Sequence, residues 1–479
     1  MTHHHDQATA RGMRFLKDFG IYTIGNIGQR LFNFILVPLY THFVAPENYG
    51  YFDLCLTYCF LLIPIATLQL REGGYRFLLD TDDETTHQQI VSFVTKTIAV
   101  ALTLVVVVGI AVSLLMPIRC LWFTVAMLAT MVIFEVMVQL VRALFGNKVF
   151  ITMGIGAAFL ICVLSVLFVV VLKWDIYGIF LANIISKGVM AIWAEWRTRL
   201  LRRYCVKPFA QLGAIRDQLL KFSLPLLPNA LCWWLISSSN RLFIKDYIGL
   251  EENGKYAVAV RMVNILVTFG NIFYQTWQEH AFTYYNTPGR NQFFSKIFNY
   301  YLCTLSLGAV IFAYAMKIVF PLFIAEDYRA GVDYLFPMAF STVFFCITFF
   351  FEMGYQCAKD TLRSMISVIC AAVLSFVLNY VLVRQFQIYG IIMTSVIVYL
   401  FLAVYRWFDT KRYFDIKLER YSIIAFFIAL VSIIPYYFIG DNMLYAIIAL
   451  AVFVPAMVAT FPAGLRREIV SKIKRKHSS

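Results

Sequence analysis

Long apolar runs recur along the whole chain, from Phe19 to Phe461, with short polar segments between them. Each run has about 20 residues, which is the length of helix that crosses a bilayer core of about 30 Å. Inside a bilayer the backbone must satisfy its own hydrogen bonds, so each run is predicted to be an α-helix. The pattern therefore predicts an all-α polytopic membrane protein with about 14 transmembrane helices.

The predicted spans form two groups of six, followed by a final pair. They lie at 18–43, 49–71, 91–116, 119–141, 149–172, 176–196, 222–245, 254–280, 296–317, 333–357, 363–384, 388–408, 420–439 and 443–463. This grouping predicts an N-terminal six-helix bundle at 1–205 and a C-terminal six-helix bundle at 206–410. Two extra helices and a basic tail would make up 411–479.

Composition excludes an ordinary soluble enzyme. Of the 479 residues, 61% are hydrophobic and 14% are charged, against about 45–50% and about 25% in soluble domains. The mean hydropathy is +0.73, and the spans leave almost no chain for a separate soluble domain. We therefore expect the function to reside within or between the spans.

The 41 lysine and arginine residues are concentrated in alternate loops and at both ends of the predicted bundle. The positive-inside rule then places both termini in the cytoplasm. The net charge of +14 is explained by this asymmetry and by attraction to anionic lipid headgroups. Membrane lipids are the expected partners of these charges, and no nucleic-acid partner is expected.

Two sequence patterns occur once in each group of six spans. A Phe-Glu-x-x-x-Gln pattern contains Glu135 and again Glu352, and an Ile-Tyr-Gly-Ile pattern contains Gly178 and again Gly390. Because six is an even number, both groups begin on the same side of the membrane. We therefore predict two parallel repeats, an arrangement that in transporters encloses a path open to alternate sides.

Five arginines are candidates for binding a phosphate group. Arg30, Arg241 and Arg261 lie inside predicted spans, and Arg71 and Arg76 lie at the cytoplasmic end of the second span. A charge inside the bilayer is costly, so such residues should face an internal cavity. Guanidinium groups bind phosphate oxygens through two hydrogen bonds and stay charged when partly buried. The alternative is that each arginine pairs with a carboxylate or extends to the headgroups.

Glu135 and Glu352 occupy corresponding positions in the two groups, near the cytoplasmic third of their spans. Such carboxylates are candidates for binding a coupling H+ or Na+. The alternative is a structural salt bridge, for instance with Arg142 or Arg363. The motifs indicate no metal site and no other cofactor.

Several stretches carry a family resemblance. Those in the N-terminal part are Phe19–Tyr22, Phe34–Thr41 and Ala45–Leu54, and those further on are Asn240–Ile244 and Gly254–Val258. With these stretches the chain resembles the polysaccharide biosynthesis flippases of the Wzx type, which translocate O-antigen and capsule precursors. This family is part of the multidrug/oligosaccharidyl-lipid/polysaccharide exporter superfamily.

The resemblance implies two six-helix bundles in a V shape plus two C-terminal helices. It also implies a flippase that moves an undecaprenyl-pyrophosphate-linked oligosaccharide from the cytoplasmic to the outer leaflet of the bacterial plasma (inner) membrane. Such a protein breaks no covalent bond and is not an enzyme. A lipopolysaccharide, O-antigen, capsule or exopolysaccharide pathway would then supply a polysaccharide polymerase and chain-length proteins as partners.

The resemblance also implies roles for the five arginines. Arg30, Arg241 and Arg261 would bind the pyrophosphate in a cationic lumen, and Arg71 or Arg76 would act at its entrance. Two alternatives stay open. An ion-coupled multidrug exporter of the same fold would favour acidic groups over cations in the lumen. A membrane-embedded glycosyltransferase or ligase would need a large outer loop with catalytic groups, whereas the predicted outer loops are short.

Overall fold

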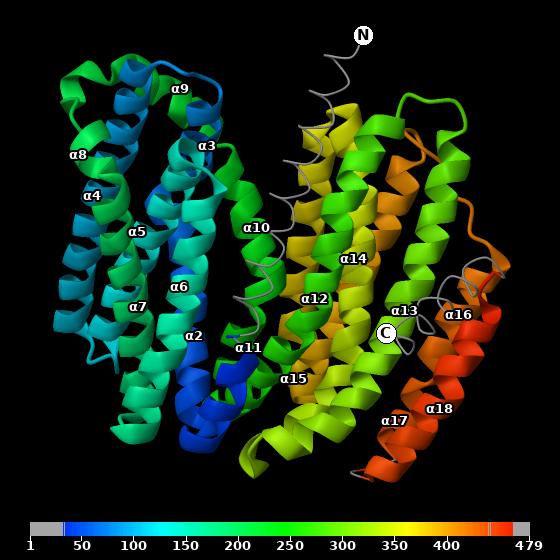
Figure 1. Cartoon of the computed structure of the whole chain (residues 1–479). Coiled ribbons are helices and arrows are strands. Elements are labelled where there is room, and N and C mark those ends of the chain that lie inside the picture. Colours follow the sequence, from blue (N-terminus) through cyan, green and yellow to red (C-terminus); the bar gives the residue numbers. More distant parts are fainter. Residues whose placement is uncertain (1–31, 33, 439, 441, 463–479) are drawn as a thin grey trace, which may run out of the picture. The chain divides into compact units, whose positions relative to one another are not determined.

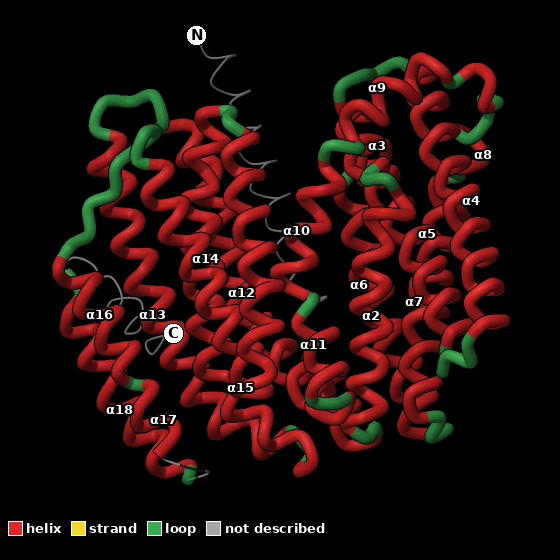
Figure 2. The backbone as a smooth tube through the Cα atoms, turned by 180° about the vertical axis from the view of Figure 1, so that it is seen from behind, coloured by secondary structure: helices red, strands yellow, loops and turns green. Residues whose placement is uncertain are grey.

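The computed structural model describes residues 32, 34–438, 440 and 442–462. Within this part the chain forms helices joined by short loops and contains no strand (Figure 2). The chain divides into two compact units, Met1–Trp234 and Leu235–Ser479. The predicted division at 1–205, 206–410 and 411–479 groups the spans differently and stays a prediction.

The first unit is built around one central helix. Its elements are α2 (Pro46–Thr67), α3 (Leu70–Leu79), α4 (Glu84–Leu115), α5 (Leu121–Phe145), α6 (Asn147–Ser165), the π-helix η1 (Val166–Val171), α7 (Asp175–Thr198), α8 (Leu200–Tyr204), the 3-10 turn η2 (Phe209–Gln211), α9 (Gly213–Ser223) and the start of α10 (Leu226–Ser238). Helix α5 contacts α2, α3, α4, α6 and α7. Its largely apolar sequence buries side chains such as Met127, Met131 and Val132, which explains its central place.

The second unit also has a central helix. Its elements are α11 (Asn240–Tyr247), α12 (Leu250–Tyr284), α13 (Arg290–Phe323), the 3-10 helix η3 (Glu326–Tyr334), α14 (Leu335–Ala358), α15 (Thr361–Thr410), α16 (Arg420–Val431), α17 (Ile433–Phe438) and α18 (Met443–Thr460) (Figure 1). Helix α14 contacts α12, α13 and α15 and is buried along most of its length.

The last helices are attached to α13 by buried polar contacts. The Lys317 ammonium donates to the carbonyl of Tyr436 at 2.6 Å, and the Tyr314 hydroxyl donates to the carbonyl of Ser432 at 2.6 Å. Both donors come from α13, and both acceptors lie at or near the break between α16 and α17. Because Lys317 is 3% exposed, its charge requires these contacts, and they fix the C-terminal pair on the bundle.

Twelve helices among the described residues are long and apolar enough to cross a membrane. One of them, α15, has 50 residues and contains two predicted spans, 363–384 and 388–408. Gln387 interrupts it with φ 49° and ψ −127°, and a Cβ on Gly390 would lie 2.2 Å from the carbonyl oxygen of Leu382. The chain therefore doubles back at this point, and α15 comprises two spans.

The prediction of an all-α polytopic protein is confirmed. The remaining difference between the about 14 predicted spans and the twelve helices found concerns the first predicted span. Most of 18–43 lies outside the described residues, and Phe34–Phe43 within it is an apolar helix. Together with the two halves of α15, this helix accounts for the difference between twelve and about 14.

The repeated sequence patterns occupy corresponding places in the two units. Glu135 lies on the central helix α5 and Glu352 on the central helix α14. Gly178 begins the helix that follows a hairpin, and a Cβ there would lie 3.1 Å from the carbonyl carbon of Phe168. Gly390 has the same place after the kink in α15. In each unit glycine permits the close approach of two consecutive helices.

Candidate functional site

A break after α2 positions the first candidate residues. Pro64 lies inside α2, and the chain then passes through Leu68 (φ 48°) and Gln69 (φ 55°) before α3 begins. Both residues have left-handed backbone conformations, which cost roughly 1–2 kcal/mol per residue when the residue is not glycine. Such strain persists where surrounding structure enforces it, commonly at functional sites. The sequence predicts a single span at 49–71, and the break at Leu68 is a correction to it.

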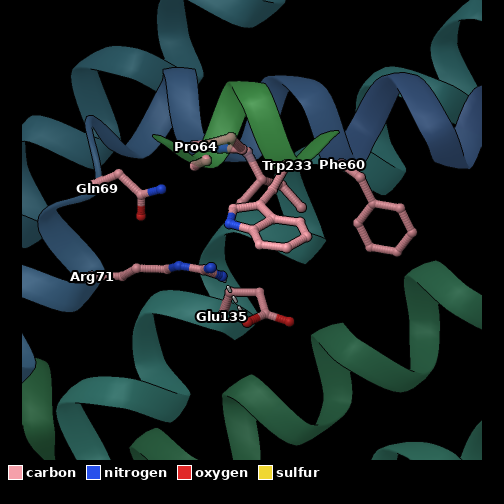
Figure 3. A pocket seen from close by; sticks show the side chains of 8 residues that line it. Phe60, Pro64, Gln69, Arg71, Glu135 and Trp233 are labelled. Carbon is pink, nitrogen blue, oxygen red and sulfur yellow. Dashed lines mark hydrogen bonds and ion pairs between the residues drawn. The ribbon is translucent and has the colours of Figure 1, made fainter. Parts of the chain in front are cut away.

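Beside this break lies a cavity of about 360 Å³ within the first unit. It is lined by Phe60, Ile63, Pro64, Gln69, Arg71, Glu135, Ala230 and Trp233. Figure 3 shows that the Arg71 guanidinium and the Trp233 indole point into the same space. Ligand sites in proteins have volumes of about 300–1,000 Å³ and combine apolar walls with a few polar groups. The cavity has this character, with one cation, one anion and two aromatic rings.

Arg71 and Glu135 form an ion pair across the cavity. Arg71 Nη1 donates to Glu135 Oε2 at 3.1 Å, and the two side chains are 25% and 39% exposed. Arg71 Nε also lies 3.3 Å from Glu72 Oε1, but it makes no hydrogen bond. The pair joins α3 to α5 in a place that solvent reaches, where ion pairs are weak and exchange readily.

One further polar group, Gln69, lines the cavity beside this pair. The amide oxygen of Gln69 is buried and accepts no hydrogen bond, and Figure 3 shows the amide on the same side of the cavity as Arg71. A buried acceptor without a donor is costly, and a ligand hydroxyl in the cavity would satisfy it.

Glu352 on α14 is held very differently. Its Oε2 atom lies 2.6 Å from Arg406 Nη1, and the side chains of Arg406 and Glu352 are 0% and 16% exposed. Ser364 donates to its other oxygen at 2.7 Å. Arg406 further donates to the carbonyl of Thr348 and to the Ser367 hydroxyl, both at 3.1 Å. These bonds tie α14 to both halves of α15.

A second charged cluster lies at the same end of the second unit. Asp409 receives a hydrogen bond from the Tyr355 hydroxyl at 2.9 Å and pairs with Arg363 and Arg412 at 3.3 and 2.5 Å. In the adjoining loop, Tyr413 donates to Asp360 at 2.7 Å, and this hydrogen bond lowers the pKa of Asp360 below its usual value. The charged groups of this cluster pair with one another, so we assign the cluster a role in stabilising the folded protein.

Known proteins define the family and the fold. The sequence model described as polysaccharide biosynthesis protein matches residues 15–277, more than half of the chain. The chain belongs to this family. A search of curated proteins finds no match to it.

Solved structures show which fold this family member has. The chain is similar to the lipid II flippase MurJ in its inward closed conformation, with a TM-score of 0.71, 12% identity and coverage of 94% of this chain and 99% of that one. It is also similar to an inward-facing multidrug resistance MATE family transporter of the MOP superfamily, with a TM-score of 0.60, 14% identity and coverage of 86% and 96%. The polysaccharide biosynthesis protein therefore has the polytopic fold shared by these proteins.

The structure separates the predicted arginines. Arg71 faces the cavity, whereas Arg76 is 63% exposed and pairs with Asp80 at 3.2 Å. In the second unit Arg241 lies over the ring of Tyr256 at 5.8 Å. Arg261 is half-buried on α12. Arg30 lies outside the described residues, and the predicted pyrophosphate roles of all five stay predictions.

The glutamates have different partners from those that sequence suggests. The salt bridges of Glu135 and Glu352 are with Arg71 and Arg406, whereas the residues considered from sequence were Arg142 and Arg363. Ion coupling by either glutamate stays a prediction.

Sequence reasoning missed Arg406 and Gln69 as parts of the two glutamate sites. Arg406 lies near the end of the predicted span 388–408, and its place before the end of the apolar run was a usable signal. Gln69 is polar within the predicted span 49–71, which was a signal of the same kind.

Proposed function

We propose that this protein is a flippase that translocates an undecaprenyl-pyrophosphate-linked oligosaccharide across the bacterial plasma membrane by alternating access. Transfer from the cytoplasmic to the outer leaflet would serve the synthesis of O-antigen, capsule or exopolysaccharide. The protein would move the headgroup without breaking a covalent bond and would act as a transporter rather than an enzyme.

The observation that carries this proposal is the cavity at Arg71. A partly exposed guanidinium offers two parallel hydrogen bonds to a phosphate group. The Trp233 indole in the same cavity offers an apolar face to a sugar ring, and the unpartnered amide oxygen of Gln69 offers an acceptor to a sugar hydroxyl. Family membership supports a polysaccharide precursor as the cargo.

The remaining parts of the proposal follow from the predicted topology. Both termini would lie in the cytoplasm, and the Arg71 end of the first unit would open toward the cytoplasmic leaflet. A proton or sodium gradient would drive the cycle. A polymerase and chain-length proteins would act on the product at the outer leaflet.

Reconstitution tests the proposal directly. Full-length protein is placed in liposomes with a fluorescent undecaprenyl-pyrophosphate-linked oligosaccharide, and an added lectin reports glycan that reaches the outer leaflet. We expect time-dependent exposure with the intact protein and loss of exposure with Arg71→Ala. The matched control is Arg203→Ala, which removes an exposed arginine of α8 that pairs with Glu84 at 2.9 Å, and it should retain transport.

The same liposomes distinguish a multidrug exporter, which the fold similarity to MATE transporters favours as the second candidate. Ion-driven efflux of a cationic dye, together with no exposure of the glycan lipid, would overturn the flippase proposal.

A further inference from the structure

We propose that Gly73 is a specificity-determining residue, which sets the width of the cavity at Arg71 by letting α9 pack closely against α3. The inference rests on the proposed function, because it takes a phosphate and a sugar as the two parts of the ligand. It goes further by assigning the size of the accepted headgroup to a contact between two helices.

Two interrupted helical segments line this cavity. In the first the chain breaks between α2 and α3, and in the second it breaks between α9, which ends at Ser223, and α10. Arg71 comes from the first segment and Trp233 from the second, and both line the cavity (Figure 3). A ligand that contacts both side chains therefore has to fit the space between the two segments.

Helix α9 lies beside α3 (Figures 1 and 2) and packs on it through a small residue on each helix. A Cβ on Gly73 would lie 2.2 Å from Ser223 Oγ, well inside van der Waals contact, and Ser223 is fully buried. Beside this contact the rings of Phe77 and Phe222 pack edge to face with their centroids 5.7 Å apart. Glycine thus permits a close approach of the two backbones. Among the described residues Ser223 Oγ makes no hydrogen bond, so the contact with Gly73 is one of packing.

The α9–α10 segment is attached to α2 at its other end. Trp234 Nε1 donates to the carbonyl of Thr57 at 3.0 Å, and both residues are buried. Between this attachment and the one at Ser223 lie Ala230 and Trp233, which line the cavity. Because the segment is held at both ends, a change in spacing at Ser223 changes the space in front of Trp233.

This spacing distinguishes two kinds of ligand. Inorganic pyrophosphate needs only Arg71, since the guanidinium supplies the hydrogen bonds to phosphate. A pyrophosphate that carries a sugar needs Arg71 and the Trp233 indole at once. A wider cavity therefore weakens binding of the second ligand and spares the first.

The neighbouring glycine provides a matched control. A Cβ on Gly74 would lie 3.2 Å from a methyl carbon of Val94 on α4 and 3.4 Å from one of Leu140 on α5. Gly74 thus faces α4 and α5, whereas Gly73 faces α9. Crowding at Gly74 strains the same helix without a direct push on the segment that carries Trp233.

The test compares binding of inorganic pyrophosphate and of a citronellyl-pyrophosphate-linked disaccharide to the full-length protein in nanodiscs. In Gly73→Val the branched side chain needs more space than rotation of the Ser223 hydroxyl provides. We expect the disaccharide to bind about tenfold more weakly and pyrophosphate to bind as before. The double variant G73V/S223G returns space on the α9 side and should restore disaccharide binding. G74A should leave the ratio of the two affinities unchanged.

A measurement without ligand follows the spacing itself. Spin-labelled noncanonical residues replace Leu79 on α3 and Lys221 on α9, both exposed, and pulsed electron paramagnetic resonance reports the distance between them. We expect a longer mean distance in G73V and the original distance in G73V/S223G. An unchanged distance in folded G73V, or a longer distance with an unchanged ratio of the two affinities, would overturn the inference.

A milder variant covers the case in which G73V does not fold. G73A should shift the distance and the affinity ratio in the same direction by a smaller amount. S223A should reverse both shifts, because without Ser223 Oγ the nearest neighbours of the added methyl group are 3.6 Å away. Shifts in G73A that S223A leaves in place would show that the contact at Ser223 is not their cause.

The inference and the proposed function fail separately. If the distance and the affinity ratio behave as expected but the glycan lipid is not flipped in liposomes, the role of Gly73 stands for another sugar-bearing phosphate ligand and the proposed function is wrong. If the glycan lipid is flipped while G73V leaves the affinity ratio unchanged, only the role of Gly73 is wrong.

Discussion

The two glutamate sites, one in each compact unit, share a sequence pattern and an arginine partner but differ in how far that pair is exposed. Glu135 is 39% exposed and pairs with Arg71 from α3, which is 25% exposed. Glu352 is 16% exposed and pairs with Arg406 from α15, which is fully buried. The first pair faces a cavity, and the second is surrounded by hydrogen-bond partners from its own unit.

This contrast shows that the same sequence pattern can hold a carboxylate in two different surroundings. A carboxylate on the central helix needs a cation in either unit, but the cation comes from a different helix in each. Where the partner is partly exposed beside a cavity, a ligand has room to approach the pair. Where the partner is buried, removal of one member leaves an uncompensated charge, and the pair serves as a fixed joint.

The largest expected effect is at the buried joint. Arg406→Ala leaves Glu352 without a cation and also removes the bonds to Thr348 and Ser367. We expect the free energy of unfolding to fall by about 3–5 kcal/mol, measured by thermal unfolding of the detergent-solubilised protein. A change below about 1 kcal/mol would contradict the structural role of this pair.

A second comparison uses the two repeat glycines. Gly390→Ala places a methyl group 2.2 Å from the carbonyl oxygen of Leu382, whereas the shortest contact from Gly178→Ala is 3.0 Å, to a methyl carbon of Val169. Overpacking of this kind costs about 1–3 kcal/mol, so G390A should lower the melting temperature more than G178A does. Equal losses in the two variants would show that the hairpins tolerate crowding alike.

The third prediction concerns the exposed pair. Arg71→Ala should lower the free energy of unfolding by no more than about 1 kcal/mol, because solvent screens a half-exposed pair. Transport of the glycan lipid in liposomes should fall at least about tenfold. Large destabilisation with transport retained per folded molecule would reverse the assignment of the two sites.

The smallest effect is expected in acid. The hydrogen bond from Tyr413 lowers the pKa of Asp360, so the ionised carboxyl is favoured in the folded state. A lowered folded pKa contributes stability that is present above the unfolded value of about 3.9 and is lost as pH falls through the folded value. Tyr413→Phe should therefore reduce stability at neutral pH and flatten its loss between about pH 4 and pH 2, followed by unfolding at fixed temperature. If the acid unfolding transition is the same in Tyr413→Phe, the Tyr413–Asp360 hydrogen bond does not contribute to the pH dependence of stability.

Part of the site was predictable because charges inside apolar runs are visible in a sequence. Glu135 and Glu352 were recognised from their repeated pattern, and Arg71 from its place at the end of a span. Their partners were not predictable, because Arg71 and Arg406 come from helices that are far apart in sequence from the glutamates. The distance between two side chains on different helices depends on helix rotation and packing, which hydropathy does not record.

The break at Leu68 and Gln69 was hidden for another reason. Left-handed backbone conformations occur mostly at glycine or asparagine, and neither residue is present at these two positions. Pro64 was a weaker signal, because prolines occur within membrane helices without ending them.

The sequence by itself determined the all-helical membrane class and the positions of most spans, because helix length and the exclusion of polar groups from lipid are local constraints. Only the tertiary structure decided which charges meet, which of them are exposed and where a cavity forms. These properties depend on how the helices pack, and the same apolar surfaces are compatible with many rotations of each helix. The difference between the partly exposed pair at Glu135 and the buried pair at Glu352 is therefore a property of packing.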